Sequence, residues 1–274
     1  MSVRQPQPST ALAGSTAMTA INDVHAAAEG VDVSNMSTFV LVHGMFHDGS
    51  MWDRVIERLE ELGHTVFGPT IAGHGKAATK HVDHAQSTQS IVDFIVERDL
   101  TDIVLVGHSY GGTIISKVAE AIPDRIRRLV FWSAFVLNDG ESMADAGSPA
   151  LRELATRLAA ESPDNTFMVP FEIWRETFIN DADLELARRS YEQLTPAPYG
   201  QLVEQLDLKK FYTLQIPRSY LAGTEDSAVP TFEIASVMRK RLGVHRLVYM
   251  PGSHELLFTN PVRLADKILE AGRD

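Results

Sequence analysis

The chain has 274 residues, of which 44% are hydrophobic and 22% are charged, a composition typical of globular proteins. Its formal net charge of −11 disfavours binding to nucleic acid and to anionic lipid, and the absence of cysteine excludes disulfides, thiolate metal ligands and a cysteine nucleophile. No apolar run approaches the ~20 residues that cross a bilayer, and residues 1–35 lack the basic and apolar regions of a secretory signal. We therefore expect a cytoplasmic protein that binds neither nucleic acid nor membrane.

The first 35 residues differ in composition from the remainder of the chain. They are rich in Ala, Ser, Thr and Gln and have no sustained hydrophobic period, which predicts a disordered tail. We expect residues 36–274 to form a single domain, in which residues 36–137 and 209–274 make the core and residues from about 138 to 208 make a helical lid.

From Thr38 onward, apolar runs rich in β-branched residues alternate with helical patterns. Continuous apolar strands separated by helices are typical of a parallel sheet that is covered on both faces. Strands are predicted at 38–42, 65–69, 102–107 and 128–133, with helices at 51–62, 86–98 and 112–121.

The alternation stops between about residues 138 and 208, where the pattern is helical and no strand is predicted. An insertion of helices into a parallel sheet is typical of a lid over the site. Helices are predicted there at 149–160, 182–194 and 197–206; strands resume at 217–222 and 246–250, followed by helices at 231–242 and 261–271.

The sequence Gly107-His108-Ser109-Tyr110-Gly111 matches the nucleophile-elbow pattern G-x-S-x-G. An apolar strand precedes it and a helix follows it, which is the context this motif requires. Ser109 must adopt a strained backbone conformation to project its hydroxyl, and glycines on either side remove side chains that would collide. A glycine-rich turn with an incidental serine is the alternative, but the context favours a nucleophilic Ser109.

A serine hydroxyl needs a base to take its proton, and in this fold the partners follow the serine in the order acid, then histidine. His254 stands just after the last predicted strand, whereas His245 begins that strand. The acid is predicted to be Asp226, which follows the strand at 217–222, and Glu225 is the only serious alternative.

Two backbone N–H groups should stabilise the oxyanion. We expect them to come from Tyr110, directly after the nucleophile, and from Met45 rather than Phe46, in the turn after the first strand. Lid aromatics must mostly pack the lid onto the sheet, although a few would line an apolar cavity over Ser109. The residues expected to line the substrate pocket are His43, Phe46, Trp174 and Phe178.

Several histidines lie near one another in the sequence, but none has metal-site spacing. His43 with His47, and His74 with the 81–84 segment, do not place ligands on one helix face, and there is no H-E-x-x-H. No Walker A or dinucleotide-binding pattern is present either. We therefore expect no metal and no cofactor.

With these motifs in place, the chain resembles the branch of the α/β-hydrolase superfamily that holds plant methylesterases and hydroxynitrile lyases. Within it, the chain is most similar to bacterial pyrethroid-hydrolysing carboxylesterases. The resemblance covers residues 38–272 and is carried by the segments 39–44 (FVLVHG), 106–112 (VGHSYGG), 107–132, 135–141 (FVLNDGE), 224–226 (TED) and 250–261 (MPGSHELLFTNP).

The resemblance implies an α/β-hydrolase fold and a cofactor-free enzyme that cleaves bulky hydrophobic esters with the triad Ser109, Asp226 and His254. Hydroxynitrile lyases have Thr at the position of Gly44 and Lys at the position of Glu255, which argues against cyanohydrin cleavage here. Two alternatives remain open: cofactor-free oxygenation or perhydrolysis by the same triad, and a ligand receptor that keeps the fold. The expected partner is a small hydrophobic ester, and the oligomeric state is not predicted.

Overall fold

The structure is a computed structural model that describes residues 36–76 and 78–274, and the predicted tail lies outside them. Within these residues, six parallel strands form the main sheet in the order β2-β1-β3-β4-β7-β8. The strands are β1 (Thr38–Val42), β2 (Thr65–Phe67), β3 (Ile103–His108), β4 (Ile126–Trp132), β7 (Arg218–Gly223) and β8 (Arg246–Met250).

Aliphatic composition explains why these segments form the centre of the sheet. All six residues of β3 and four of the five residues of β1 are buried, as parallel strands covered on both faces must be. The predicted strands at 38–42 and 246–250 coincide with β1 and β8, and the other four agree with the structure to within two residues at each end.

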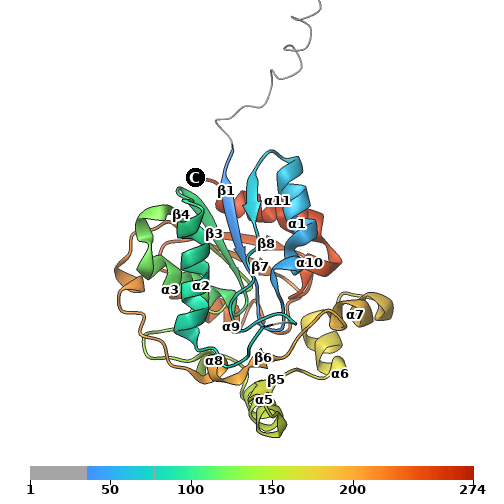
Figure 1. The fold of residues 1–274 in the computed structure, drawn as a ribbon. Helices are drawn as coiled ribbons and strands as arrows, with labels where there is room; N and C mark the ends of the chain where they lie inside the picture. The colour runs from blue at the N-terminus through green and yellow to red at the C-terminus, as the bar shows by residue number, and fades with distance from the viewer. Residues whose placement is uncertain (1–35, 77) are drawn as a thin grey trace, which may run out of the picture. The chain divides into compact units, whose positions relative to one another are not determined.

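Helices cover both faces of the sheet (Figure 1). The helices α1 and α11 pack together on one face, where α11 contacts β4, β7 and β8, and the helices α2 and α3 pack together on the other, where α3 contacts β1, β3 and β4. The predicted α/β architecture is therefore confirmed. Their bounds are α1 (Asp53–Glu61), α2 (His84–Glu97), α3 (Gly111–Ala121) and α11 (Pro261–Gly272), and two further helices are α9 (Ile234–Lys240) and α10 (Leu256–Thr259).

The segment between β4 and β7 is mostly helical and lies next to the carboxyl ends of the strands (Figure 1). Its helices are α4 (Met143–Ala146), α5 (Pro149–Glu161), α6 (Phe171–Ile173), α7 (Leu184–Tyr191) and α8 (Tyr199–Val203), and a π-helical turn spans Trp174–Phe178.

We predicted no strand in this segment, and that was wrong. The two-residue strands β5 (Thr166–Phe167) and β6 (Ala197–Pro198) pair antiparallel. A two-residue strand has no hydrophobic period, so no sequence pattern reveals it.

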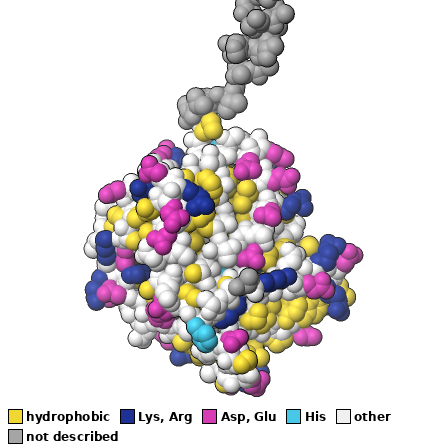
Figure 2. Space-filling model, in the orientation of Figure 1, with side chains coloured by type: hydrophobic (Ala, Val, Ile, Leu, Met, Phe, Trp, Pro, Cys, Tyr) yellow, Lys and Arg dark blue, Asp and Glu magenta, His cyan; other side chains and the backbone are white. Residues whose placement is uncertain are grey.

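Loops at the carboxyl ends of β1, β3, β7 and β8 carry the motifs identified in the sequence, so the sheet brings them to one edge. Acidic and basic side chains are interspersed over the face shown in Figure 2. No helix in the described part of the chain combines the length and hydropathy of a membrane-spanning segment.

Candidate active site

Ser109 lies in the sharp turn between β3 and α3. Its φ of 52° is in the left-handed region that residues other than glycine seldom adopt. The turn is fixed from both sides, because the Ser109 N–H donates to the carbonyl of Trp132 over 3.2 Å, and the Ser109 carbonyl accepts from the N–H groups of Gly112 and Phe135. Strain of this kind persists only where neighbouring structure enforces it, and it is concentrated at functional sites.

Glycine is required on both sides of this turn. A Cβ atom on Gly107 would lie 2.6 Å from the carbonyl oxygen of Gly111, and one on Gly111 would lie 2.6 Å from the carbonyl oxygen of Val42. Any side chain there would therefore separate β3 from α3 or α3 from β1.

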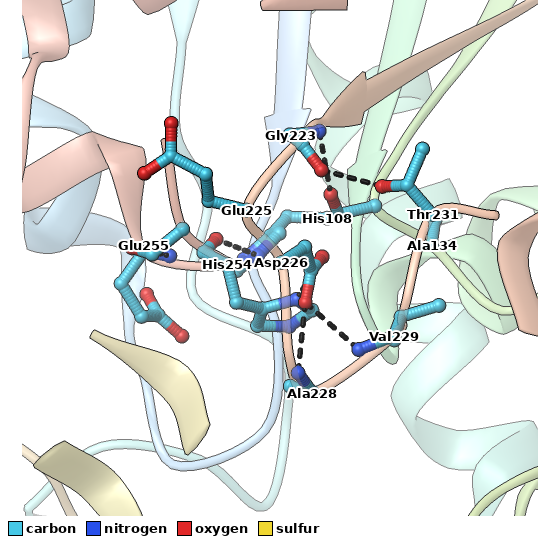
Figure 3. Close-up of polar contacts among 12 residues, drawn as sticks. His108, Ala134, Gly223, Glu225, Asp226, Ala228, Val229, Thr231, His254 and Glu255 are labelled. Atoms are coloured by element: carbon cyan, nitrogen blue, oxygen red, sulfur yellow. Dashed lines mark hydrogen bonds and ion pairs between the residues drawn. The ribbon is translucent and has the colours of Figure 1, made fainter. Parts of the chain in front are cut away.

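His254 and Asp226 meet at the carboxyl ends of β8 and β7. The Nδ1 atom of His254 lies 2.8 Å from Oδ2 of Asp226, and both side chains are buried (Figure 3). The second carboxylate oxygen of Asp226 accepts hydrogen bonds from the N–H groups of Ala228 and Val229 at 2.9 and 2.8 Å. Three donors thus hold the carboxylate toward the imidazole.

Glu225, the alternative acid, is exposed, and its side chain points away from His254 (Figure 3). Its backbone is held instead, because its N–H donates to the carbonyl of Gly252 and its carbonyl accepts from Asn180. The geometry therefore favours Asp226 as the partner of His254.

His108 fixes the opposite side of His254. Its Nε2 atom lies 3.1 Å from the carbonyl oxygen of His254, and its ring stacks on Trp132 with centroids 4.0 Å apart. Burial, reinforced by the charges of His254 and His47, places the pKa of His108 well below 6.5. A neutral His108 therefore donates its Nε2 proton to that carbonyl.

The charge environment favours the protonated form of His254. Burial by itself would lower the pKa of His254, but the charge of Asp226, its hydrogen bond and the charge of Glu255 outweigh this effect and raise the pKa above 6.5. An imidazole that has taken up a proton is therefore stabilised at this position.

Ser109 and His254 line the same cavity. No hydrogen bond joins their side chains among residues 36–76 and 78–274, and Nδ1 of His254 is occupied by Asp226, so Nε2 is the nitrogen left for the serine hydroxyl. Hydrogen bonds between a nucleophile and its base are often long without substrate and shorten when substrate binds.

The two amides predicted to bind an oxyanion lie next to this cavity. Met45 is in the loop after β1 and lines the cavity, and Tyr110 directly precedes the first turn of α3. Neither N–H group donates a hydrogen bond to another described residue. The N-terminus of α3 adds its partial positive charge at the same place.

Apolar side chains dominate the walls of the cavity. They come from the loops after β1, β4 and β7 and from the helical segment between β4 and β7. The principal ones are Phe46, Phe135, Met143, Leu151, Leu154, Phe167, Val169, Phe178, Leu202 and Val229. Such walls suit an apolar substrate.

Of the four predicted pocket residues, Phe46 and Phe178 line the cavity, and the rings of Phe178 and His254 lie nearly perpendicular with centroids 5.7 Å apart. The prediction for His43 was wrong. Its side chain is fully buried beneath the loop, where Nδ1 donates to the carbonyl of Gly44 at 2.8 Å and Nε2 accepts from the N–H of Ile71 at 3.0 Å. Burial lowers the pKa of His43 well below 6.5, so it stays neutral and holds the loop.

The prediction for Trp174 was also wrong. Trp174 is fully buried behind Phe178, with which it stacks at 5.6 Å, and its indole N–H donates to Ser190 at 3.0 Å. The π-helical turn places these two rings on the same side, so only Phe178 reaches the cavity.

The sequence analysis did not identify the pair formed by His47 and Glu255, which lies in the cavity wall. The Nε2 atom of His47 is 3.0 Å from Oε2 of Glu255, and Nδ1 is 2.5 Å from the carbonyl oxygen of Met45. Both side chains are buried. The only sequence signal is position, because His47 follows the His43-Gly44 turn and Glu255 follows His254.

Within the described part of the chain, one group of three side chains brings possible metal ligands together. His108, His254 and Glu255 each bring a ligand atom within 4.8 Å of the others. Nε2 of His108 is hydrogen-bonded to a carbonyl and Nδ1 of His254 to Asp226, which leaves Nδ1 of His108 and Nε2 of His254 without a partner among the described residues. Two other histidines considered in the sequence analysis are hydrogen-bonded through Nε2, His74 to Gln201 and His84 to Thr113.

Comparisons with known proteins show what the chain is similar to. The family model described as the alpha/beta hydrolase family matches residues 39–267. A solved alpha/beta-hydrolase from a Paenibacillus species is 43% identical with a TM-score of 0.84, over 87% of this chain and all of that one. It is described as extracellular and as sharing structural and functional homology with tobacco salicylic acid binding protein 2.

Two curated relatives are named for the compounds they hydrolyse. The carbendazim hydrolyzing esterase of a Nocardioides species is 39% identical over 111 residues, which are 39% of this chain, and the match spans 46% of that protein. The pyrethroid hydrolase of Sphingobium wenxiniae is 25% identical over 249 residues, which cover 86% of this chain and 87% of that protein.

Proposed function

The chain belongs to the alpha/beta hydrolase family, and we propose that it is a serine carboxylesterase that cleaves hydrophobic esters with Ser109, His254 and Asp226. Family membership and relatives named as esterases support an ester hydrolase. The observation that carries the proposed triad is the 2.8 Å contact between Asp226 and His254, which lines the same cavity as Ser109.

In the proposed mechanism, Nε2 of His254 takes the proton of the Ser109 hydroxyl as Oγ attacks the ester carbonyl carbon. The carbonyl oxygen becomes an oxyanion, which the N–H groups of Met45 and Tyr110 stabilise. His254 then gives its proton to the departing alcohol, and the acyl group stays on Ser109. A water molecule then gives a proton to His254 as its oxygen attacks the acyl carbon. The bond between that carbon and Oγ breaks, the acid leaves, and His254 returns the proton to Oγ of Ser109.

Asp226 has a specific part in these steps. With Nδ1–H bonded to Asp226, the imidazole keeps the tautomer in which Nε2 accepts the serine proton. The imidazolium that forms in each half of the reaction is stabilised by the same carboxylate, in keeping with the raised pKa of His254.

The proposed substrates are bulky hydrophobic esters of the pyrethroid type. The apolar cavity wall supports this polarity, and one relative is named a pyrethroid hydrolase. The cavity is lined from several elements rather than by one exposed apolar helix, so we do not expect interfacial activity on emulsified triglyceride.

The test is a panel of p-nitrophenyl esters and pyrethroids, assayed with and without an organophosphate that modifies active-site serines. Turnover that the organophosphate abolishes, with one adduct on Ser109, is the expected result. Binding without turnover would instead favour the receptor alternative. Oxygen consumption with a quinolone-type substrate, in place of ester cleavage, would favour the oxygenase alternative.

The proposed compartment is the cytoplasm and the proposed partner is the small ester alone. The Paenibacillus relative is described as extracellular, so compartment needs a direct measurement. Cell fractionation with an antibody to this chain would decide it, and recovery of the chain from the medium would contradict the proposal.

A further inference from the structure

The cavity wall contains one carboxylate that the proposed mechanism does not use. Glu255 follows His254 in the chain, its residue is 1% exposed, and it lines the cavity among mostly apolar side chains. Its Oε2 atom contacts Nε2 of His47 at 3.0 Å. Its other oxygen, Oε1, has no hydrogen-bond partner within residues 36–76 and 78–274.

His47 fixes the carboxylate in place and leaves that oxygen as an acceptor. The carbonyl of Met45 requires Nδ1 of His47 to carry a proton, so the contact between Nε2 and Glu255 needs a second proton. That proton resides on His47 or on Oε2 of Glu255. In either form Oε1 has lone pairs and no proton, so it accepts hydrogen bonds.

Packing prevents the pair from turning away from the cavity. The ring of His47 stacks on Phe258 with centroids 6.1 Å apart, and the ring of Trp174 lies 5.9 Å away. The N–H of Glu255 donates to Ser253 Oγ at 3.2 Å. The carboxylate of Glu255 is therefore held rigidly. A group that selects a ligand has to be rigid.

The position of Glu255 determines where on the substrate a hydrogen-bond donor has to lie. A carboxylate oxygen of Glu255 lies within 4.8 Å of a ring nitrogen of His254. Because His254 acts at the scissile bond, we expect a group bonded to Glu255 to be attached within a few atoms of the ester carbonyl.

We propose that Glu255, held by His47, is an acceptor subsite that selects esters with an O–H or N–H group next to the scissile carbonyl. The inference rests on the proposed esterase function and narrows its substrate class to hydroxy esters and carbamates with apolar remaining parts. A buried acceptor left without a donor penalises substrates that lack one, which is how hydrogen-bonding sites discriminate.

Two matched ester pairs test this subsite. Methyl mandelate and methyl 2-phenylpropanoate differ in having a hydroxyl or a methyl group on the carbon next to the carbonyl. Methyl N-phenylcarbamate and its N-methyl derivative provide the N–H comparison. For each pair, the kcat/KM of the donor ester is divided by that of its partner. This ratio is then divided by the same ratio of hydroxide-catalysed rates, which corrects for the difference in intrinsic reactivity between the two esters. The expected preference of the native protein for the donor ester is about 10- to 100-fold in at least one pair.

Variants of Glu255 separate recognition from structure. Glu255→Met removes the acceptor, so the preference should fall at least about tenfold, whatever common loss both esters suffer. Glu255→Gln should retain much of the preference, because its amide N–H can donate to Nε2 of a neutral His47 while its oxygen remains free to accept. Glu225→Gln is the matched control, because it makes the same change at an exposed glutamate. It should leave the ratio of the two kcat/KM values unchanged.

Each outcome tests either the Glu255 subsite or the esterase function. No preference in the native protein for either pair overturns the subsite, as does a preference that survives in Glu255→Met. If Glu255→Met does not fold, the native ratios and Glu255→Gln still test the proposal. Failure of the native protein to hydrolyse any ester, including the p-nitrophenyl panel, overturns the esterase function itself.

Discussion

The N–H of Ser109 donates to the carbonyl of Trp132 over 3.2 Å, and this bond joins the turn after β3 to the end of β4. Ser109 has a φ of 52°, so the neighbouring strand holds it in a conformation that it would not adopt alone. The backbone alone, without the hydroxyl, makes every contact that fixes the turn. A mutation that removes only the hydroxyl of Ser109 should therefore remove its chemistry and keep the turn.

Ser109→Ala should abolish ester turnover and leave the fold intact. The hydroxyl is the proposed nucleophile, whereas the hydrogen bonds that hold the turn come from backbone atoms. A residual rate of about 10³-fold over water should remain, from the oxyanion amides and substrate binding. Steady-state kinetics and thermal unfolding of the purified variant measure the two effects. Near-native kcat in this variant would refute the serine mechanism.

The motifs of the candidate site could be predicted because each is local. The elbow around Ser109 is recognisable from adjacent residues, and His254 from its place after the last strand. Buried strands such as β1 are recognisable because their composition reflects burial on both faces.

Contacts between segments far apart in the chain could not be predicted. His47 and Glu255 are separated by 208 positions, and no pattern in a single sequence indicates that they are in contact. Trp174 and Phe178 look equivalent in sequence, but the π-helical turn puts Phe178 in the cavity wall and Trp174 behind it. Which aromatic faces substrate is decided by packing, and a hydrophobic pattern does not encode that choice.

The pH dependence of kcat/KM should reflect His254. Because its pKa lies above 6.5, His254 becomes protonated as the pH falls through that raised value and can no longer accept the serine proton. Activity should therefore be full at higher pH and be lost with a midpoint above 6.5. His108 should not contribute, because its pKa is well below 6.5.

Measuring kcat/KM for one neutral ester from about pH 5 to about pH 9 gives this midpoint. Thermal unfolding at each pH controls for loss of the fold. A midpoint clearly below 6.5, with the fold intact, would contradict the assigned environment of His254.

Gly44→Thr should lower kcat by about tenfold or more. A Cβ atom on Gly44 would lie 3.1 Å from Cβ of Ser109 and 3.1 Å from Nδ1 of His108, so the loop would have to move. Movement of that loop misplaces the Met45 amide relative to the oxyanion. Gly200→Ala is a matched control, because a Cβ there has no neighbour within 4 Å. Equal activity of both variants would show that the loop tolerates the side chain.

Deletion of residues 1–35 should change neither kcat/KM nor the melting temperature. The segment lacks an apolar period in its sequence, so it should contribute little burial to the domain. Comparing the full chain with residues 36–274 by kinetics and thermal unfolding tests this. A fall in melting temperature of several degrees on deletion would mean that the segment packs on the domain.

Asp226→Asn should reduce kcat by about 10⁴, by analogy with the serine proteases. An asparagine that keeps its oxygen on the N–H groups of Ala228 and Val229 would turn its NH₂ toward Nδ1 of His254. Nδ1 would then have to accept, so Nε2 would carry the proton and could not act as the base. Because the raising influence of Asp226 is also lost, the midpoint of the remaining acid limb should move to lower pH.

Glu225→Gln, at the position before Asp226, should by contrast have little effect on kcat. The Glu225 side chain is exposed, and the contacts that hold this residue come from its backbone. Its charge reaches His254 only through solvent, where it is screened, so kcat should stay within about a factor of two. Both variants are measured with one small ester at the same pH. If Glu225→Gln were the crippled enzyme and Asp226→Asn were nearly normal, the acid of the triad would be Glu225, and the hydrogen bond between His254 and Asp226 would be structural.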